Sequence, residues 1–316
     1  MVDDDACRAE AAFRPGRATG PLVAFDKENV GLAKATPRSP EYCLHIETTR
    51  AKESDVERSK TIILIHGNFV NNETWALWKG HYEARGYAVY TPANPGHEGV
   101  PAELRENVHP DLGATGFIDV VENIERLIDT LPDKPLVIGH SMAGAVVMKL
   151  IEQDKVVAGV SVHGAPPKNV FPVPFQTIKA VFSAIGLFSR QKTWLGTPEW
   201  FNGAFFNTLP EEQREAAYER FAVPESFKVN TQLLFNSYSK VDFGKPHAPL
   251  LFIGGGSDQI FPAHLTQRIA GRYTDESSQV DVKIVEGRSH FTCGEPGWEN
   301  VADGILDWYE ELEVQP

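Results

Sequence analysis

The feature that most constrains the fold is a serine placed where an apolar strand passes directly into a helix. The β-branched run 136–138 leads into Gly139-His140-Ser141-Met142-Ala143-Gly144, and a segment with helical character, 143–153, follows at once. Glycines around a serine allow a sharp turn, and the following helix directs its N-terminal amides at that turn. The pattern predicts a free, nucleophilic hydroxyl on Ser141. Gly-x-Ser-x-Ala taken alone is also compatible with an ordinary turn serine.

Strand-like and helix-like segments alternate along most of the chain. Expected strands include uniformly apolar runs, as in strands buried on both faces; they lie at 22–25, 42–48, 61–65, 86–90, 136–138, 156–162, 249–253 and 280–285. Helical spacing of apolar residues is clearest at 118–128, 143–153, 262–272 and in a closing helix that ends near Leu312. Strands that alternate with helices imply right-handed crossovers and a mainly parallel, twisted sheet flanked by helices.

The alternation stops between residues 166 and 246. This quarter of the chain is helical in character and holds nearly half of the Phe, Tyr and Trp residues. We therefore predict a helical cap at 166–246, inserted between two parts of an α/β core at 21–165 and 247–316. Residues 1–20 mix charged residues with Ala, Gly and Pro, and they predict a loose N-terminal arm.

Composition narrows the range of partners and compartments. The 316 residues carry a formal net charge of −13, which argues against nucleic acid as a partner because a basic stripe is missing. The sequence has neither an apolar run of membrane-spanning length nor a secretory h-region, so we expect no membrane association and a cytoplasmic location. Cys7, Cys43 and Cys293 are widely scattered and predict neither a disulfide framework nor a zinc site.

A serine nucleophile needs a base, and that base needs an acidic partner. Asp258 lies on a glycine-rich turn after strand 249–253, and His290 lies on a turn after strand 280–285. Since the carboxyl ends of parallel strands meet at one edge of a sheet, both side chains are expected beside Ser141. Asp258 alone would also suit a helix N-cap. The order Ser, Asp, His beyond three strand ends favours a catalytic triad.

Other candidate residues carry weaker signals. Ser161 resembles the Ser141 pattern, but prolines follow it instead of a helix, so it is interpreted as a strand residue. His140 is interpreted as packing, and His163 as a strand-end residue near the pocket. The end of strand 156–162 carries no carboxylate that could rival Asp258. The remaining histidines lack ligand spacing, so we expect no metal, and no P-loop or other cofactor motif is present.

Taken together, these motifs resemble those of the α/β-hydrolase superfamily over about residues 40 to 312. The resemblance includes the turn around Ser141, His66-Gly67 after a strand, Pro95-Gly96-His97, the Asp258 turn and the Gly287–Phe291 turn. It implies Ser141 as nucleophile, His290 as general acid/base and Asp258 as orienting acid. The oxyanion hole would be the backbone N–H groups of Asn68 and Met142, with Phe69 less favoured than Asn68. The superfamily often has glycine where this sequence has Ala143. We interpret this difference as a change of local shape and not as a loss of function.

The expected activity is two-step hydrolysis of a small-molecule ester or lactone with an apolar portion. An aromatic cap predicts an apolar pocket, and the candidate substrate-binding residues are Phe69, His140, His163, Trp194 and Trp200. A C–C bond hydrolase acting on a diketone is an alternative with the same triad. A cofactor-free lyase and a ligand receptor on the same fold are further alternatives. The sequence does not define the oligomeric state.

Overall fold

The structure is a computed structural model that describes residues 58–170, 173–186 and 189–312. The predicted N-terminal arm at 1–20 and the extended segments expected at 22–25 and 42–48 lie outside the described residues. Within the described residues, strands and helices alternate on both sides of a long insertion. The α/β class predicted from the sequence is confirmed.

A six-stranded sheet forms the centre of the fold, with the strand order β2-β1-β3-β4-β7-β8. Each neighbouring pair in this sheet is parallel, so the mainly parallel arrangement is confirmed. The strands are β1 (Thr61–Ile65), β2 (Ala88–Tyr90), β3 (Leu136–His140), β4 (Ala158–Val162), β7 (Leu250–Gly255) and β8 (Val280–Val285).

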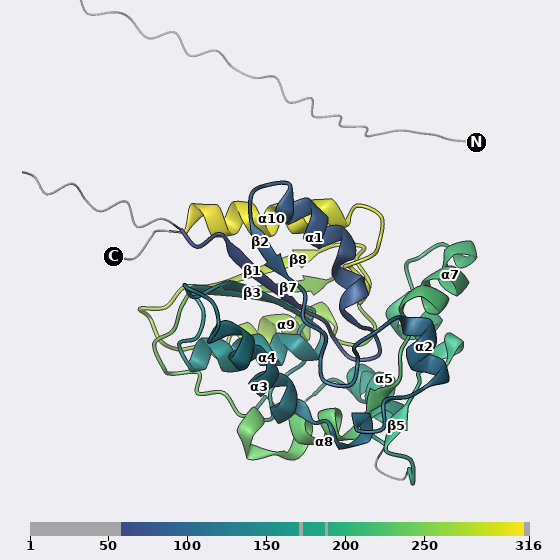
Figure 1. Ribbon diagram of the computed structural model, residues 1–316. Helices are drawn as coiled ribbons and strands as arrows, with labels where there is room; N and C mark the ends of the chain where they lie inside the picture. The colour runs from purple at the N-terminus through teal and green to yellow at the C-terminus, as the bar shows by residue number, and fades with distance from the viewer. Residues whose placement is uncertain (1–57, 171–172, 187–188, 313–316) are drawn as a thin grey trace, which may run out of the picture. The chain divides into compact units, whose positions relative to one another are not determined.

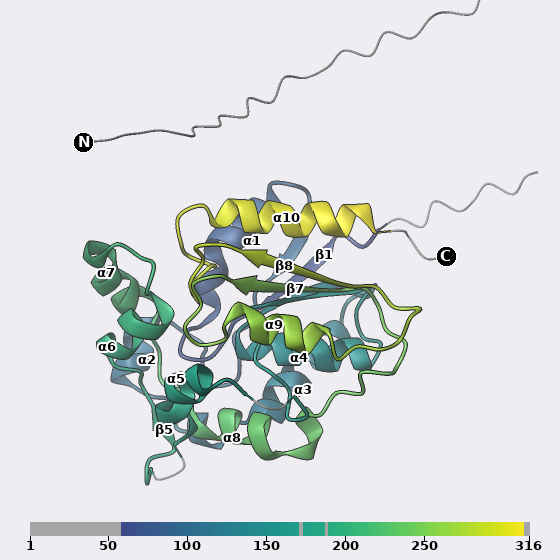
Figure 2. The ribbon, with the colours of Figure 1, turned by 180° about the vertical axis from the view of Figure 1, so that it is seen from behind.

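Helices cover both faces of the sheet (Figure 1). One layer holds α1 and α10, and the other holds α3, α4 and α9 (Figure 2). These helices are α1 (Ala76–Glu83), α3 (Phe117–Ile128), α4 (Met142–Glu152), α9 (Ala263–Ala270) and α10 (Trp298–Glu311), with a short α2 (Pro101–Glu106) before α3. The 3-10 turns η1 (Asn72–Trp75) and η2 (Leu112–Ala114) complete this part of the chain.

The apolar run of β1 explains why two layers of helices are needed. Successive strand side chains point to opposite faces, and Ile62 and Leu64 join one apolar cluster, with residues of α1 and α10. Ile63 and Ile65 join the other cluster, with residues of α3, α4 and α9. A strand that is apolar on both faces thus requires cover on both sides, as the uniform run predicts.

The insertion between β4 and β7 is mostly helical and includes a small antiparallel pair of strands. Its elements are α5 (Phe175–Ile185), β5 (Thr193–Trp194), α6 (Pro198–Trp200), the π-helix η3 (Phe201–Phe205), α7 (Glu211–Phe221), β6 (Glu225–Ser226), α8 (Phe227–Phe235) and η4 (Ser237–Ser239). The arrowheads of β7 and β8 point toward it in Figure 2. The insertion therefore lies at the edge where these strands end.

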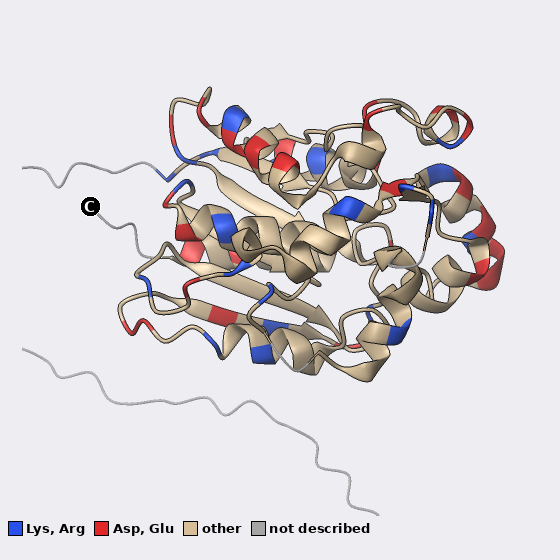
Figure 3. Cartoon of the chain, turned by 90° about the horizontal axis from the view of Figure 1, so that it is seen from below, with Lys and Arg blue, Asp and Glu red and all other residues tan. Residues whose placement is uncertain are grey.

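Charged residues of both signs are interspersed along the described helices and loops (Figure 3). Acidic residues are the more numerous in the sequence, as the net charge of −13 requires. Among the described residues, no helix combines the length and the apolar character that crossing a bilayer demands. Cys293 is buried as a free thiol.

Candidate active site

Ser141 occupies a strained turn between β3 and α4. Its φ of 57° and ψ of −121° place a non-glycine residue outside the ordinary helix and strand regions. The turn is so tight that a Cβ atom on Gly139 would collide with the carbonyl oxygen of Ala143. The Ser141 N–H donates to the Val162 carbonyl at 2.9 Å, which ties the turn to β4. The Ala143 methyl group fits into the core, where it is fully buried.

Three polar side chains from three different strand ends form a continuous hydrogen-bond chain. Ser141 Oγ lies 2.9 Å from His290 Nε2, and His290 Nδ1 lies 2.8 Å from Asp258 Oδ2. His290 and Asp258 are buried, and Ser141 retains 7% of its surface exposed. Because Asp258 accepts from Nδ1–H, the neutral imidazole leaves Nε2 free to accept the serine proton. The structure thus brings together the three residues that the sequence predicted as a triad.

Asp258 is held by hydrogen bonds on both of its oxygens. Oδ1 accepts from the backbone N–H groups of Ile260 and Phe261 at 2.7 and 2.9 Å. Oδ2 accepts from His290 and also from His163 Nδ1, each at 2.8 Å. Burial acts to raise the pKa of Asp258, but the electrostatic interaction with His290 and the hydrogen bonds from both histidines outweigh it and hold the pKa below its usual range. The carboxylate therefore stays ionised at neutral pH.

His140 supports His290 through a hydrogen bond to the backbone carbonyl of His290. Its Nε2 lies 2.7 Å from the carbonyl oxygen of His290, so Nε2 carries the proton and donates it. Burial, together with the nearby His290 and His163, holds the pKa of His140 well below its usual range. A neutral ring that donates to the His290 carbonyl fits the interpretation of His140 as packing.

His163, Asp258 and His290 offer ligand atoms that all lie within 4.8 Å of one another, a spacing that also suits a metal ion. Both histidine Nδ1 atoms, however, lie 2.8 Å from the same carboxylate oxygen. That distance is typical of a charge-assisted hydrogen bond. Each nitrogen therefore directs a proton, and not a lone pair, at Asp258, and the geometry is that of a hydrogen-bond network.

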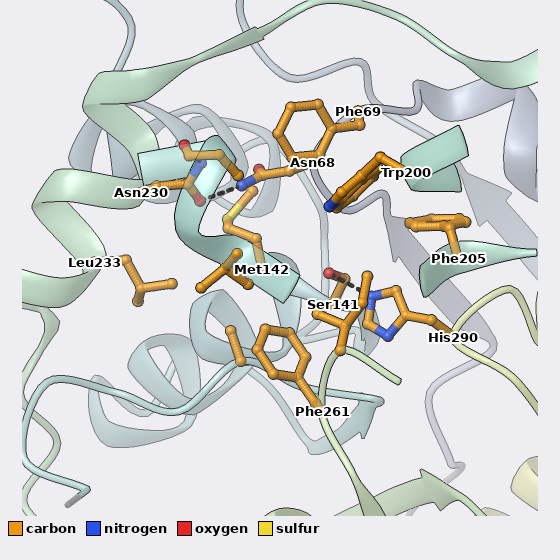
Figure 4. A pocket seen from close by; sticks show the side chains of 14 residues that line it. Asn68, Phe69, Ser141, Met142, Trp200, Phe205, Asn230, Leu233, Phe261 and His290 are labelled. Atoms are coloured by element: carbon orange, nitrogen blue, oxygen red, sulfur yellow. Dashed lines mark hydrogen bonds between the residues drawn. The ribbon is translucent and has the colours of Figure 1, made fainter. Parts of the chain in front are cut away.

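Asn68 and Met142, whose backbone N–H groups are the predicted oxyanion donors, both line the pocket that contains Ser141. Met142 is the first residue of α4, where helix geometry provides its N–H with no carbonyl partner. Asn68 follows β1, and Gly67 before it lets this loop approach Ser141, since a Cβ on Gly67 would lie 2.6 Å from Ser141 Cβ. The side-chain amide of Asn68 donates to Asn230 Oδ1 of α8 at 2.7 Å (Figure 4). The loop that carries the Asn68 amide is thereby anchored to the insertion.

A mostly apolar pocket lies over Ser141 and His290 (Figure 4). Its empty volume is about 400 Å³, including the part that opens to solvent. The core contributes residues from its strand-end loops and from α4, and the insertion contributes side chains from α5, α6, η3 and α8. The lining residues are Asn68, Phe69, Ser141, Met142, Ala165, Val181, Ala184, Trp200, Phe205, Asn230, Leu233, Ile260, Phe261 and His290.

The five residues predicted to bind substrate fall into two groups. Phe69 and Trp200 line the pocket, whereas His140, His163 and Trp194 do not. Trp194 packs edge-on against Phe69 and Trp200 at ring-centroid distances of 5.3 and 5.5 Å. His140 and His163 lie beneath the pocket in the hydrogen-bond network. The aromatic enrichment indicated the kind of pocket, but it did not separate lining residues from residues that support them.

Several lining residues carried no sequence signal. Asn230, Val181 and Leu233 lie in ordinary amphipathic helices, and no motif marks them. Phe261 was detectable in principle, since it lies three residues after Asp258 in the turn that leads into α9. The contact between His163 and Asp258 was also missed, although β4 lies between β3 and β7 in the sheet. That strand order brings the end of β4 between Ser141 and the Asp258 turn.

The site thus consists of a strained serine at a strand-to-helix turn, with histidine and aspartate from later strand ends of a parallel sheet beside it. The sequence matches the model of the alpha/beta hydrolase family over residues 62–303. The chain belongs to that family, and by class it is a hydrolase. A search of curated proteins found no match to the sequence.

Solved structures share the fold at low sequence identity. A pyrethroid hydrolase from Sphingobium faniae JZ-2 is 19% identical, with 79% of this chain and 97% of that chain covered and a TM-score of 0.61. A methylesterase from Arabidopsis is 14% identical, with 80% and 99% covered and a TM-score of 0.58. Tomato methylketone synthase I, complexed with 2-tridecanone, is 14% identical, with 81% and 99% covered and a TM-score of 0.57. At these identities the likeness concerns the fold.

Proposed function

We propose that the protein is a serine hydrolase that cleaves a small ester or lactone with an apolar portion. The observation that carries this proposal is the hydrogen-bond chain from Ser141 through His290 to Asp258, because it opens into an apolar pocket at the serine end. In this proposal Ser141 is the nucleophile, His290 the general acid/base and Asp258 the orienting carboxylate. No metal or cofactor takes part.

The first step forms an acyl-enzyme. His290 Nε2 takes the Ser141 proton as Oγ attacks the carbonyl carbon, and the carbonyl oxygen becomes an oxyanion. The protonated His290 is stabilised by the ionised Asp258. The His290 Nε2 proton then passes to the leaving alcohol as the carbon–oxygen bond breaks.

In the second step, a water molecule gives a proton to His290 and attacks the acyl carbon. The bond between that carbon and Ser141 Oγ then breaks, His290 returns the proton to Oγ, and the carboxylic acid leaves. The backbone N–H groups of Asn68 and Met142 donate to the oxyanion in both steps. One such donor contributes about 3–4 kcal/mol to transition-state stabilisation in serine hydrolases. The ionisation of Asp258, which follows from its lowered pKa, is what this mechanism requires at neutral pH.

The pocket lining supports a substrate with an apolar portion. Phe69, Trp200 and Phe205 contribute aromatic surface, and Leu233 and Phe261 extend the apolar wall. Asn68 and Asn230 are the polar exceptions among the side chains above the serine. An ester substrate also agrees with the presence of a methylesterase among the structural neighbours. An alcohol is also a better leaving group than an amine.

Fluorophosphonate labelling combined with p-nitrophenyl ester turnover tests the proposal. We expect stoichiometric modification of the wild type at Ser141, located by peptide mass spectrometry. We expect Ser141→Ala to abolish labelling and to lower kcat/KM at least about 10,000-fold. Ser161→Ala is the matched control, because Ser161 is also a buried serine near a strand end but its Oγ has no hydrogen-bond partner. That variant should keep both activities.

The same experiment separates the alternatives. A folded wild type that binds apolar ligands but resists the label would overturn the proposal in favour of a ligand receptor. A labelled protein that releases carbon–carbon cleavage products from a diketone, but hydrolyses neither esters nor lactones, would identify a C–C bond hydrolase. A lyase would form products without incorporating oxygen from ¹⁸O-water. Product analysis over a panel of esters, lactones and diketones therefore accompanies the label.

A further inference from the structure

A second histidine lies on the carboxylate of the proposed triad. His163 follows directly after β4, and its Nδ1 lies 2.8 Å from Asp258 Oδ2. His290 Nδ1 approaches the same oxygen at the same distance. Both rings are fully buried, and their centroids lie 5.8 Å apart. Oδ2 of Asp258 is therefore shared between the histidine that faces Ser141 and one that does not.

The backbone at residue 163 and the neighbouring Gly255 fix the position of the His163 ring. Its backbone has a φ of 49°, in the left-handed region that non-glycine residues seldom adopt, and its N–H donates to the Ile253 carbonyl at 2.7 Å. The room for the ring comes from Gly255, where a Cβ would lie 2.5 Å from His163 Cε1. One glycine of the 254–256 run therefore leaves space for a ring at Asp258.

The second ring nitrogen of His163, Nε2, also has a hydrogen-bond partner. Its Nε2 lies 2.9 Å from the Thr292 hydroxyl oxygen, two residues beyond His290. When Nδ1 carries the proton that Asp258 accepts, Nε2 of a neutral ring accepts from the Thr292 hydroxyl. Both nitrogens then have partners without any charge on His163. A fully partnered, buried ring of this kind is rigid, because turning it would break two buried hydrogen bonds.

The geometry of Asp258 shows what this second donor can do. Oδ1 is fixed by two backbone N–H groups, which restrain one end of the carboxylate. Oδ2 depends on side chains alone, namely His163 and His290. In the mechanism proposed above, His290 gains and loses a proton and approaches different partners during a turnover. His163 has no such task, so it can hold Oδ2 throughout.

We propose that His163 is a positioning residue of the hydrolase. By donating Nδ1–H to Asp258 Oδ2, it keeps the carboxylate aimed at His290 while His290 transfers protons. This inference rests on the proposed function, because it assigns His163 a role in the reaction of the Ser141, His290 and Asp258 chain. It acts through Asp258 and not on the substrate, since His163 does not line the pocket.

Two substitutions at position 163 separate positioning from packing. His163→Asn keeps an N–H donor close to the place of Nδ1, whereas His163→Phe keeps the ring and loses the donor. Positioning predicts that Phe lowers kcat about 10- to 100-fold, by analogy with the loss of a group that orients a metal-bound histidine, with KM within about twofold. It predicts that Asn retains most of kcat. A packing role predicts the reverse order, because Phe fills the cavity better than Asn.

Two threonine variants add a graded test and a control. Thr292→Val removes the partner of His163 Nε2 while keeping the side-chain shape, and it should lower kcat about three- to tenfold, the effect of one lost neutral hydrogen bond. Thr266→Val is the matched control, because Thr266 is buried and its hydroxyl has no partner. Rates are normalised to the fraction of enzyme titrated by fluorophosphonate, so partial unfolding does not count as lost activity.

The outcomes distinguish failure of this inference from failure of the proposed function. If the wild type neither accepts the label nor hydrolyses any ester or lactone, the proposed function is wrong, and the role of His163 in it falls as well. If the wild type is active and His163→Phe retains its kcat, or His163→Asn loses more than His163→Phe, then His163 only fills space. The order Asn above Phe, with KM unchanged, supports the inference.

Discussion

The two sides of the pocket are built by different physical means. The lower side consists of strand-end residues of the core, and its polar side chains meet at hydrogen-bond distances of 2.7 to 2.9 Å. The upper side consists of the insertion residues Val181, Ala184, Trp200, Phe205, Asn230 and Leu233, which are mostly apolar. Aromatic rings pack edge-on there, as between Trp200 and Phe69 at 5.2 Å.

This contrast predicts how each side responds to change. Hydrogen bonds are directional, so the lower side should tolerate almost no substitution without losing the chemical step. Apolar contacts are non-directional and roughly proportional to buried area, so the upper side should tolerate substitutions that alter which substrates bind. Four predictions test whether the lower side performs the chemical step while the upper side selects the substrate.

The largest effect is expected for Asp258→Asn. An asparagine can still accept from Ile260 and Phe261, but its NH₂ group would then face the Nδ1–H of His290 and His163, donor against donor. His290 would have to take the other tautomer or turn away, and an equivalent change in a serine protease costs about 10,000-fold in kcat. Steady-state kinetics on a p-nitrophenyl ester measure this loss. Asp281→Asn on β8, whose carboxylate bonds Trp308 and Gln279, should leave kcat unchanged.

On the upper side, Trp200→Ala should act on binding. Loss of a large aromatic wall removes apolar contact area, and burial of such a side chain contributes about 1.5–3 kcal/mol. We expect kcat/KM for long-chain esters to fall about 10- to 100-fold through KM, with short-chain esters nearly unaffected. A chain-length series of p-nitrophenyl esters measures it, with Trp308→Ala on α10 as control. A fall in kcat that is equal for all chain lengths would break the proposed division.

Asn230 links the two sides, and its loss should have an intermediate effect. Asn230→Ala leaves the Asn68 amide and the Ala184 carbonyl without the partners that Asn230 provides. Because Asn68 also carries a proposed oxyanion donor, we expect kcat to fall about three- to tenfold, in keeping with a single hydrogen bond. Asn169→Ala, which removes hydrogen bonds to Val241 away from the pocket lining, is the control. An unchanged kcat would show that the loop after β1 holds its shape without the insertion.

The smallest effect is expected at a second link, the buried pair of His97 and Glu225, whose Nε2 and Oε2 atoms lie 3.4 Å apart. Burial acts to lower the pKa of His97, but the Glu225 charge and hydrogen bond outweigh it and raise the pKa above its ordinary value. The pair therefore stabilises the fold fully below about pH 6.5, the unfolded pKa, and less as pH rises through the folded pKa. Glu225→Gln should lower the free energy of unfolding on the order of 1 kcal/mol more at pH 6 than at pH 9.

Urea unfolding at the two pH values measures this difference, and subtraction of the wild-type values removes the contribution of other titrating groups. Asp303→Asn is the matched control. It breaks the more exposed pair with His81, in which the Asp303 side chain is 40% exposed, and surface pairs contribute little. Equal losses at both pH values for Glu225→Gln would show that His97 does not titrate as part of the pair.

The sequence predicted Ser141, Asp258 and His290 because each follows a segment with strand character, at a turn that contains glycine. Parallel strands then bring Ser141, Asp258 and His290 to one edge without further information. From the aromatic content of the insertion, the sequence also predicted an apolar pocket. It could not predict which rings reach the pocket, because Trp194 and Trp200 are alike in sequence context and differ only in how the short elements around them fold.

His163 is an example of a contact that the sequence could not predict. As a histidine at the end of an apolar strand it was placed near the pocket, but the sequence did not connect it to Asp258. That contact depends on the strand order, which places β4 between β3 and β7, and on the left-handed backbone at residue 163. Neither the order nor a positive φ on a non-glycine residue can be derived from apolar periodicity.

The positive φ of Ser141 has a consequence for evolution and engineering. A non-glycine residue in such a backbone conformation costs about 1–3 kcal/mol, and glycine at the same position would relieve most of it. The most stable residue at position 141 is therefore one without a hydroxyl. A laboratory selection for thermal stability alone would favour loss of the serine, so any such selection of this hydrolase needs an activity screen beside it.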